Sequence, residues 1–289
     1  MSDQTTPAPK VVSIGDSGTG VIQAGQKLPL VLVAGPCVIE SEQLLLETAT
    51  AIKAIAARVG IPFIFKSSYL KDNRSQADYY RGPGLEEGLR LLSKVRSEVG
   101  VPVLSDIHDA ASATACGEVL DVIQIPAYLS MQTSLAEAVA ATGKVVNVKK
   151  GQFLAPSDMV NVVGKIRAAG NDKIILTERG TVHGYHNLVV DMRALPQMRS
   201  QGYPVMFDVT HAVRIYGLPS ADPRGGQPEY IIPLARAGVA AGVDMIFIET
   251  HPDCANALCD AASMLPLDQL EKLLLILKRI HNTIGGESE

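Results

Sequence analysis

Short aliphatic runs rich in β-branched residues recur along the chain, and most are followed by a stretch with the periodicity of an amphipathic helix. The aliphatic runs predict strands at Leu30–Gly35, Phe63–Ser68, Pro102–Ile107, Val122–Ala127, Val145–Lys150, Ile174–Arg179, Pro204–Thr210 and Met245–His251. The helical stretches include Ser41–Arg58, Leu85–Val99, Ser157–Ala169, Tyr230–Ala241 and Leu267–Ile280. Eight strands alternating with helices predict an α/β fold, a closed (β/α)8 TIM barrel.

An open, doubly wound sheet is the alternative interpretation of the same alternation. The junction after the first strand reads GPC, not G-x-G-x-x-G, which argues against a dinucleotide site and favours the barrel. Ahead of it, VVSIG and VIQAG flank the turn residues Asp16–Gly18 and predict a short β-hairpin. We expect a single domain over residues 1–289, with an N-terminal extension and hairpin at 1–28 and the barrel at 29–289.

Composition narrows the class of protein. Of 289 residues 47% are hydrophobic, but tryptophan is absent and aromatic residues make up 4%, so a large core has to be aliphatic. The polar start has no signal-peptide pattern, and no apolar run reaches the length of a membrane span. Four cysteines in so long a chain suggest reduced thiols, and a net charge of −4 without a basic tract argues against nucleic acid. We expect a soluble cytoplasmic enzyme with no nucleic-acid or membrane partner.

Polar or charged side chains follow the predicted strands, and in a (β/α)8 barrel such side chains converge on one mouth that carries the active site. They are Cys37, Lys66, Ser68, Asp106, His108, Gln124, Lys149, Lys150, Arg179, Asp208, His211, Glu249 and His251. One of them alone would fit a solvated strand end, but their presence at every strand indicates a site. The cations Lys66, Lys149 and Arg179 predict a ligand with several anionic oxygens.

The segment Phe65–Gly84 sets four cations against two carboxylates, a net charge of +2 in a chain of −4. Short hydrogen-bonding side chains lie between the cations, a combination that suits a phosphate or carboxylate ligand. A solvated loop of mixed charge would have a similar composition. The place of the segment, at and directly after a strand end, favours the oxyanion site.

Metal-ligating side chains occur at or beyond strand ends at Cys37, His211, Glu249 and Asp260. A thiolate with an imidazole suits zinc or ferrous iron, and carboxylates also admit manganese. Spacing alone leaves open that Cys37 packs as a small hydrophobic side chain. For Cys254 and Cys259 we expect packing along a helix, not a second metal or redox pair.

Seven motifs in a fixed order carry a family resemblance. They are LVAGPCVIES at Leu32–Ser41, FKSSYLKDNRS at Phe65–Ser75, YRGPGLEEG at Tyr80–Gly88, IQIPAYL at Ile123–Leu129, NVKKGQF at Asn147–Phe153, FDVTHAV at Phe207–Val213 and ETHPD at Glu249–Asp253. By these motifs the chain resembles the 3-deoxy-D-manno-octulosonate 8-phosphate synthases over nearly its whole length. One motif alone would not be specific, but the combination is.

The resemblance implies a transferase that condenses phosphoenolpyruvate with D-arabinose 5-phosphate and water. The products are 3-deoxy-D-manno-octulosonate 8-phosphate and phosphate, for lipopolysaccharide (KDO) biosynthesis, and the family is usually a homotetrameric barrel. The alternative is the related DAHP synthase, which uses erythrose 4-phosphate; KDNRS at Lys71–Ser75 favours the five-carbon sugar, because the rival typically has a Pro-Arg-Thr element there. A Schiff-base aldolase using Lys66 or Lys149 and a non-catalytic ligand-binding barrel are further alternatives.

The resemblance also implies roles for single residues. Those implied as catalytic are Lys66, Lys71, Lys149 and His211. Those implied to bind substrate are Ser68, Asn73, Arg74, Ser75, Asp106, Gln124 and Arg179, with Arg74 on the sugar phosphate. Metal-dependent members have Cys after the Gly-Pro of the first motif, where other members have Asn. The implied ligands of a divalent metal ion (Zn, Fe or Mn) are therefore Cys37, His211, Glu249 and Asp260.

Two positions depart from the family pattern. Met131 and Ser134 stand where the family generally has Arg and Asp, and that Arg is implied to reach the sugar phosphate in a neighbouring subunit's site. Either Arg74 suffices for the phosphate, or Arg214 or Arg224 substitutes for the missing side chain, or the acceptor aldose differs. The segment RIYGLPSADPRGG, rich in Gly and Pro, has the length of a mobile lid over the mouth.

Overall fold

The computed structural model describes residues 7–182, 187–218 and 222–286. A parallel sheet closes on itself, because β11 pairs with β12 and β12 pairs with β3. The barrel strands are β3 (Val31–Gly35), β4 (Phe63–Lys66), β5 (Val103–Asp106), β6 (Val122–Ile125), β7 (Val145–Lys149), β8 (Ile174–Glu178), β11 (Val205–Asp208) and β12 (Met245–His251). Their residues are all buried, which explains why they read as continuous apolar runs. The predicted (β/α)8 barrel is confirmed.

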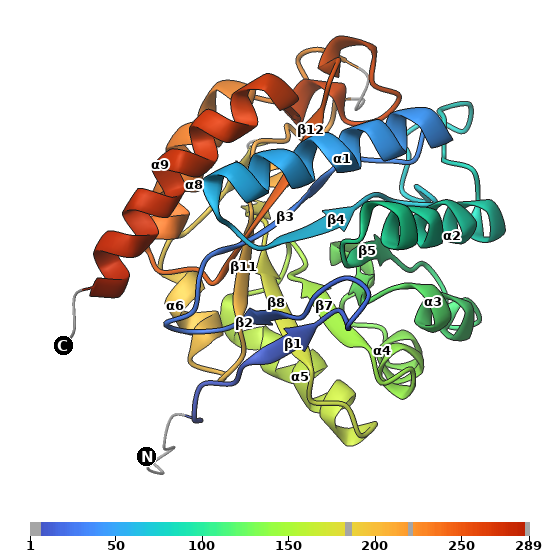
Figure 1. Cartoon of the computed structure of the whole chain (residues 1–289). Helices are drawn as coiled ribbons and strands as arrows, with labels where there is room; N and C mark the ends of the chain where they lie inside the picture. The colour runs from blue at the N-terminus through green and yellow to red at the C-terminus, as the bar shows by residue number, and fades with distance from the viewer. Residues whose placement is uncertain (1–6, 183–186, 219–221, 287–289) are drawn as a thin grey trace.

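Helices surround the strands in a ring (Figure 1). They are α1 (Glu42–Val59), α2 (Leu85–Lys94), α3 (Ala113–Val119), α4 (Thr133–Ala141), α5 (Met159–Ala168), α6 (Ala194–Arg199), α7 (Val209–Ala212), α8 (Ile231–Ala240) and α9 (Leu267–Gly286). A π-helical turn, Val95–Val99, extends α2, so the predicted helix over Leu85–Val99 is continuous. Helices α3, α4 and α6 were not predicted; they are short, and two of them are rich in alanine.

The predicted N-terminal hairpin is also confirmed. Strands β1 (Val12–Ile14) and β2 (Ile22–Ala24) are antiparallel, and Asp16 Oδ1 accepts hydrogen bonds from backbone amides of the connecting turn. The apolar side chains of the hairpin pack on inward-facing residues of the barrel strands: Val31, Val33, Ile64, Leu104, Val122, Val145, Ile175, Met206, Met245 and Phe247. The hairpin therefore covers the amino-terminal end of the barrel, and the mouth at the carboxyl ends of the strands stays uncovered by it.

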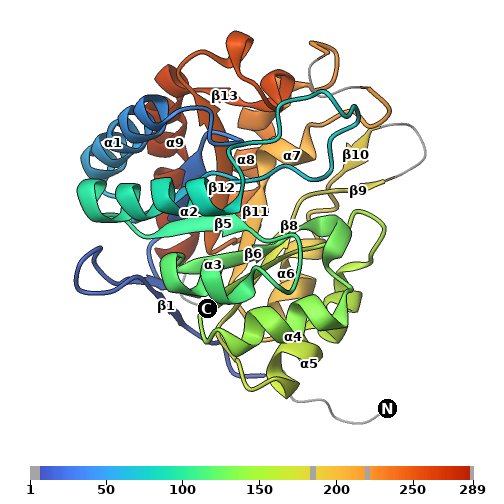
Figure 2. The ribbon, with the colours of Figure 1, turned by 90° about the vertical axis from the view of Figure 1, so that its right-hand side faces the viewer.

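The two ends of the barrel can be followed in the ribbon views. Figure 1 shows β1 and β2 across the barrel strands, and Figure 2 shows β1 on the side away from the short pair β9 (Thr181–Val182) and β10 (Leu188–Val189). That pair follows β8 and lies at the mouth. Because the hairpin lies far from the mouth, a substitution in the hairpin should change the stability of the protein without changing ligand binding.

Six predicted strands extend one or two residues past their observed ends, and β11 is the one that turns directly into an α-helix. Strand β11 stops at Asp208, because the Asp208 side chain accepts a 3.0 Å hydrogen bond from the backbone amide of His211 and caps the short helix α7. The expected strand over Pro204–Thr210 is therefore wrong for its last two residues. The early turn brings the His211 imidazole back against the Asp208 carboxylate at the mouth.

The described helices include none that is both long enough and apolar enough to cross a membrane.

Candidate active site

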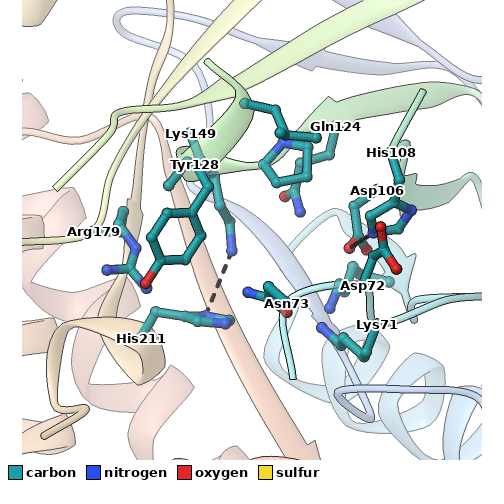
Figure 3. Close-up of a pocket in the computed structure, with 14 residues that line it drawn as sticks. Lys71, Asp72, Asn73, Asp106, His108, Gln124, Tyr128, Lys149, Arg179 and His211 are labelled. Atoms are coloured by element: carbon teal, nitrogen blue, oxygen red, sulfur yellow. Dashed lines mark hydrogen bonds and ion pairs between the residues drawn. The ribbon is translucent and has the colours of Figure 1, made fainter. Parts of the chain in front are cut away.

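Two cavities open at the carboxyl ends of the strands and share several lining residues, so they form one continuous site. The first, of about 150 Å³, is lined by the predicted residues Lys66, Lys71, Asn73, Asp106, Gln124, Lys149, Arg179 and His211 (Figure 3). The second, of about 330 Å³, adds Arg74, Ser75 and Asp260. Ser68, Cys37 and Glu249 line neither cavity, but each is buried in contact with a residue that does.

Lys66, at the end of β4, forms a buried ion pair. Its Nζ atom lies 2.8 Å from Glu249 Oε1 and also donates to the backbone carbonyl of Cys37 at 3.1 Å, while both charged side chains are 1% exposed. Burial alone would raise the pKa of Glu249, but the positive charge of Lys66, with His211 and Lys71 nearby, lowers it to about 2. Glu249 is therefore an anion at neutral pH.

Lys149, Asp208 and His211 form a second charged group. Lys149 Nζ is 2.6 Å from Asp208 Oδ2, and His211 Nδ1 is 2.8 Å from the same oxygen. Burial alone would raise the pKa of Asp208, but His211 and Lys149 hold it well below its usual range. Burial lowers the pKa of Lys149, so its ammonium gives up a proton more easily than an exposed one. Figure 3 shows the Lys149 ammonium and the His211 imidazole facing each other, with 3.5 Å between Nζ and Nδ1.

Asp106 joins the side chains on the other side of the first cavity. Ser68 Oγ donates to Asp106 Oδ1, and His108 Nε2 lies 3.3 Å from Asp106 Oδ2. Burial favours the neutral acid, but Lys71, His108 and Lys66 keep the pKa of Asp106 well below its usual range. Burial would lower the pKa of Lys71, yet its electrostatic interactions with Cys37, Asp106 and Glu249 raise it well above the ordinary value. Lys71 is therefore a permanent cation here.

Gln124 is oriented by residues that the sequence analysis did not single out. Asn147 Nδ2 donates to Gln124 Oε1 at 3.0 Å, and Thr177 Oγ1 donates to Asn147 Oδ1. With its oxygen engaged, Gln124 offers its amide N–H groups as donors to the cavity that it lines. Gln124 and Asn147 are register partners on β6 and β7, and Thr177 on β8 lies two residues beyond the register partner of Asn147. This relation becomes visible only once the strand register is known.

Two tyrosines from loops complete the wall near Arg179. Arg179 Nη1 donates to Tyr216 Oη at 2.8 Å, and its Nε is buried without a partner among the described residues. Tyr128, which stands beside Arg179 in Figure 3, is hydrogen-bonded to Tyr216, and burial raises its pKa to about 12. The tyrosines were missed, because aromatic residues in loops carry no signal that separates a binding wall from a surface.

The arginines proposed to hold the sugar phosphate take different places. Arg74 Nη1 lies 2.7 Å from Cys259 Sγ, and Arg214 is paired with Asp260; both arginines line the second cavity. Arg224 pairs with Asp222 and its side chain is 79% exposed, so it lines neither cavity. The predicted lid, Arg214–Gly226, falls partly on residues 219–221, which lie outside the described residues.

The metal-ligating side chains form two buried groups that share Asp260. One contains His211, Glu249 and Asp260, the other Cys37, Cys259 and Asp260; within each group the ligand atoms lie within 4.8 Å of one another. The donors suit a divalent ion, since imidazole, carboxylate and thiolate are the side chains that bind Zn²⁺ and Fe²⁺. His211 fits this use, because its Nδ1 faces Asp208 while its Nε2 faces Glu249 and Asp260 at 3.9 and 3.8 Å.

The expected helical packing of Cys254 and Cys259 is wrong. Helical turns cover only Cys254–Asn256 and Ala261–Ser263, and Cys259 lies between them. Its Sγ is 2.9 Å from Cys37 Sγ, while Cys254 Sγ contacts the backbone carbonyl of His251 at 3.6 Å. The error arises because a spacing in sequence cannot show a contact with a residue at the other end of the chain.

Comparison with known proteins identifies the family. A sequence model of the DAHP synthetase I family matches residues 9–285. The chain belongs to this family. A protein of Acidithiobacillus ferrooxidans is 54% identical over 265 residues, which are 92% of this chain and 94% of its own length. Proteins of Trichlorobacter lovleyi and a Geobacter species are 55% and 56% identical over 261 residues, 90% of this chain and 96% and 95% of theirs. All three are named 2-dehydro-3-deoxyphosphooctonate aldolase, the second name of the synthase that the motifs resemble.

Within the DAHP synthetase I family, this chain carries Met131 in the loop after β6. Met131 is 36% exposed, and its backbone carbonyl accepts a hydrogen bond from Lys165 Nζ at 2.6 Å. It lines neither cavity, and Ser134 is exposed. Among the described residues that line the second cavity, the guanidinium groups are those of Arg74, Arg179 and Arg214.

Proposed function

We propose that the protein condenses phosphoenolpyruvate with D-arabinose 5-phosphate and water, forming 3-deoxy-D-manno-octulosonate 8-phosphate and inorganic phosphate for lipopolysaccharide (KDO) biosynthesis. The observation that carries this proposal is the continuous double cavity, lined by Lys66, Lys71, Lys149, Arg74 and Arg179. Two substrates that each carry a phosphate need cations at two places in one mouth. The names of relatives that are 54–56% identical support the same reaction.

The two cavities receive the two substrates in this proposal. Phosphoenolpyruvate occupies the first, with its carboxylate and phosphate oxygens bound by Lys66, Ser68, Gln124, Lys149 and Arg179. The buried Nε of Arg179, which has no hydrogen-bond partner among the described residues, and the orientation of the Gln124 amide support this assignment. The second cavity takes arabinose 5-phosphate, for which the groups are Lys71, Asn73, Arg74, Ser75 and Asp106.

Carbon–carbon bond formation uses the π electrons of phosphoenolpyruvate. Its C3 attacks the aldehyde carbon of the sugar, and the aldehyde oxygen takes a proton and becomes a hydroxyl. Positive charge develops at C2, where a water oxygen adds and loses a proton. The C2–O bond to phosphate then breaks, phosphate leaves with the electron pair, and the C2 hydroxyl loses its proton to become the ketone. Buried, preorganised charges stabilise such a transition state because they need no reorientation during the reaction.

Lys149 is the group that holds and moves a proton in this scheme, while His211 acts through the metal ion that it would help to hold. The lowered pKa of Lys149 makes its ammonium a proton donor for the developing hydroxyl, and Asp208 keeps it aimed at the cavity. Cys37, His211, Glu249 and Asp260 would hold a divalent ion, Zn, Fe or Mn, whose charge orients and acidifies the water or polarises the aldehyde. Lys71 and Lys66 remain charged partners of the phosphate-bearing substrates.

The test is a coupled assay of phosphate release with phosphoenolpyruvate and aldose phosphates of four, five and six carbons. We expect the fastest turnover with arabinose 5-phosphate and none without an added divalent metal ion. Faster turnover with erythrose 4-phosphate would instead favour the DAHP synthase reaction. Borohydride with phosphoenolpyruvate or pyruvate should leave no covalent adduct, since Lys66 and Lys149 are both in ion pairs and not free amines.

Quaternary structure and location form part of the same proposal. The resemblance implies a homotetramer, and the composition and charge of the chain predict a soluble, cytoplasmic protein with no nucleic-acid or membrane partner. Light scattering on the purified chain should give four times the chain mass of 30.7 kDa. A monomer that is fully active would contradict the tetramer without affecting the reaction.

A further inference from the structure

Two sulfur atoms meet beside the proposed metal ligands, although their positions are far apart in sequence. Cys37 Sγ and Cys259 Sγ lie 2.9 Å apart, and the two side chains are only 1% and 3% exposed. Both are free thiols, and their separation is well beyond the roughly 2.05 Å of a disulfide bond. The pair therefore consists of two buried, potentially metal-binding sulfurs in contact.

This sulfur pair is continuous with the other donors through Asp260. The Asp260 carboxylate lies within 4.8 Å of both sulfurs and, in the second group, within 4.8 Å of His211 and Glu249 donors. Two ligand atoms on one tetrahedral zinc ion, with bonds of about 2.0–2.3 Å, are themselves roughly 3.3–3.8 Å apart. The observed separations can thus adjust to one ion, and the two sulfurs have to move apart by less than about 1 Å.

The carboxylates near the sulfur pair already have positively charged partners, and two thiolates would add negative charge beside them. Glu249 already has Lys66 at 2.8 Å, and Asp260 has Arg214. Arg74 Nη1 places one positive charge 2.7 Å from Cys259 Sγ. A divalent ion would offset the charge of two buried thiolates, which otherwise carry a high desolvation cost.

We infer that Cys259 is a further metal ligand, so that the ion of this site is bound by two thiolates, from Cys37 and Cys259. The inference rests on the metal dependence in the proposed function. A second thiolate makes the donor set softer, and the site therefore selects Zn²⁺ or Fe²⁺ over Mn²⁺. Cys259 directly precedes Asp260, so neighbouring residues of one loop supply two ligands to the same ion.

The first test needs no substitution. The full-length protein is stripped of metal, kept reduced with a phosphine, loaded with one equivalent of Zn²⁺ and examined by X-ray absorption at the zinc edge. We expect two sulfur neighbours at about 2.3 Å, with nitrogen and oxygen neighbours at about 2.0–2.2 Å. A best fit with one sulfur, or with none, overturns the inference.

Substitutions give a second, independent readout. In the Co²⁺-loaded protein, Cys259→Ser should halve the sulfur-to-cobalt charge-transfer absorption per bound ion. It should also weaken Zn²⁺ binding by more than the roughly 10- to 100-fold effect of losing an outer-sphere partner, with little change for Mn²⁺. Cys254→Ser is the matched control in the same loop, since its sulfur is hydrogen-bonded to the His251 carbonyl and belongs to neither group of metal-ligating side chains found among the described residues, and it should keep the full spectrum. Full absorption in Cys259→Ser overturns the inference.

These readouts are separate from the reaction, because they require no substrate. Two sulfur neighbours in a protein that fails to release phosphate from phosphoenolpyruvate and arabinose 5-phosphate would leave the two-thiolate site standing and refute the proposed function. Correct product formation with a single sulfur neighbour would do the reverse.

Discussion

Arg74 carries the clearest functional prediction for a single side chain. It lines the second cavity, and Met131 removes the cation that the family resemblance would add there. Arg74→Ala should raise the KM for arabinose 5-phosphate about 10- to 100-fold, because a hydrogen bond to a charged group is worth about 1.5–3 kcal/mol. Initial rates with each substrate varied in turn should show less than about threefold change in the KM for phosphoenolpyruvate.

Arg224→Ala is the control for this experiment. Its guanidinium pairs with Asp222 and is largely exposed, so both KM values should stay at the wild-type level. Equal increases for the two substrates in Arg74→Ala would contradict the division of the site into two cavities.

Side chains at strand ends could be predicted from the sequence, whereas their partners could not. Lys66, Gln124 and Arg179 follow from the barrel pattern, because strand carboxyl ends converge whatever the loops do. Cys259 and Tyr216 belong to loops, and their contacts with Cys37 and Arg179 depend on loop paths that no local pattern encodes. The sequence thus specifies which strand ends face the mouth, and the folded loops determine what surrounds them.

The N-terminal hairpin should contribute to stability and not to binding. Ile14 is 1% exposed and packs into the amino-terminal end of the barrel, opposite the mouth. Ile14→Ala should lower the free energy of unfolding by about 2–4 kcal/mol, the cost of a buried cavity of this kind. Urea denaturation gives this value, and steady-state kinetics should show unchanged KM values.

Val11→Ala serves as the comparison, because Val11 is 53% exposed and should change the free energy of unfolding by less than about 0.5 kcal/mol. A drop in kcat for Ile14→Ala at a temperature where the protein remains folded would show that the hairpin also acts on the mouth.

Strands were easier to predict than helices in this chain. Strands of a closed parallel barrel are buried on both faces and form continuous apolar runs such as Met245–His251, which the structure reproduces residue for residue. Short helices such as α3 and α4 bury few side chains and show little periodicity. The end of β11 could not be foreseen, because Asp208 acts there as a helix cap and not as a strand residue.

Acid should destabilise the whole molecule through its buried carboxylates. The pKa values of Asp106 and Asp208 lie well below the usual range, so the stability they contribute is present above a pH of about 4 and is lost as pH falls further. The free energy of unfolding should therefore decrease between about pH 5 and 3. Asp106→Asn should reduce the slope by up to about 1.4 kcal/mol per pH unit.

Urea denaturation at a series of pH values measures this slope. An Asp106→Asn protein with the wild-type slope would show that the carboxylate is not held ionised by Lys71 and its neighbours. Asp109→Asn, which removes an exposed carboxylate from the same loop, is the matched control.

Removal of metal should abolish turnover without unfolding the barrel. The metal-ligating groups lie at one end of the barrel, and the hydrophobic core formed by the described helices and strands includes none of them. Treatment with a chelator should therefore leave the far-ultraviolet circular dichroism unchanged and stop phosphate release, which Zn²⁺, Fe²⁺ or Mn²⁺ restores. Cys37→Ala with undiminished metal content and activity would contradict the ligand assignment.

The pairing of β12 with both β3 and β11 bears on how the chain is made. A ribosome adds residues one after another, so β3, near the start, waits for β12 while more than two-thirds of the barrel is synthesised. Until then the nascent sheet has two unpaired edges, each able to join a strand of another chain. The yield of soluble protein in cells should thus depend on how well those unpaired edges are shielded during synthesis. Pairing of β12 with β3 and β11 removes both edges and, with them, the risk of aggregation.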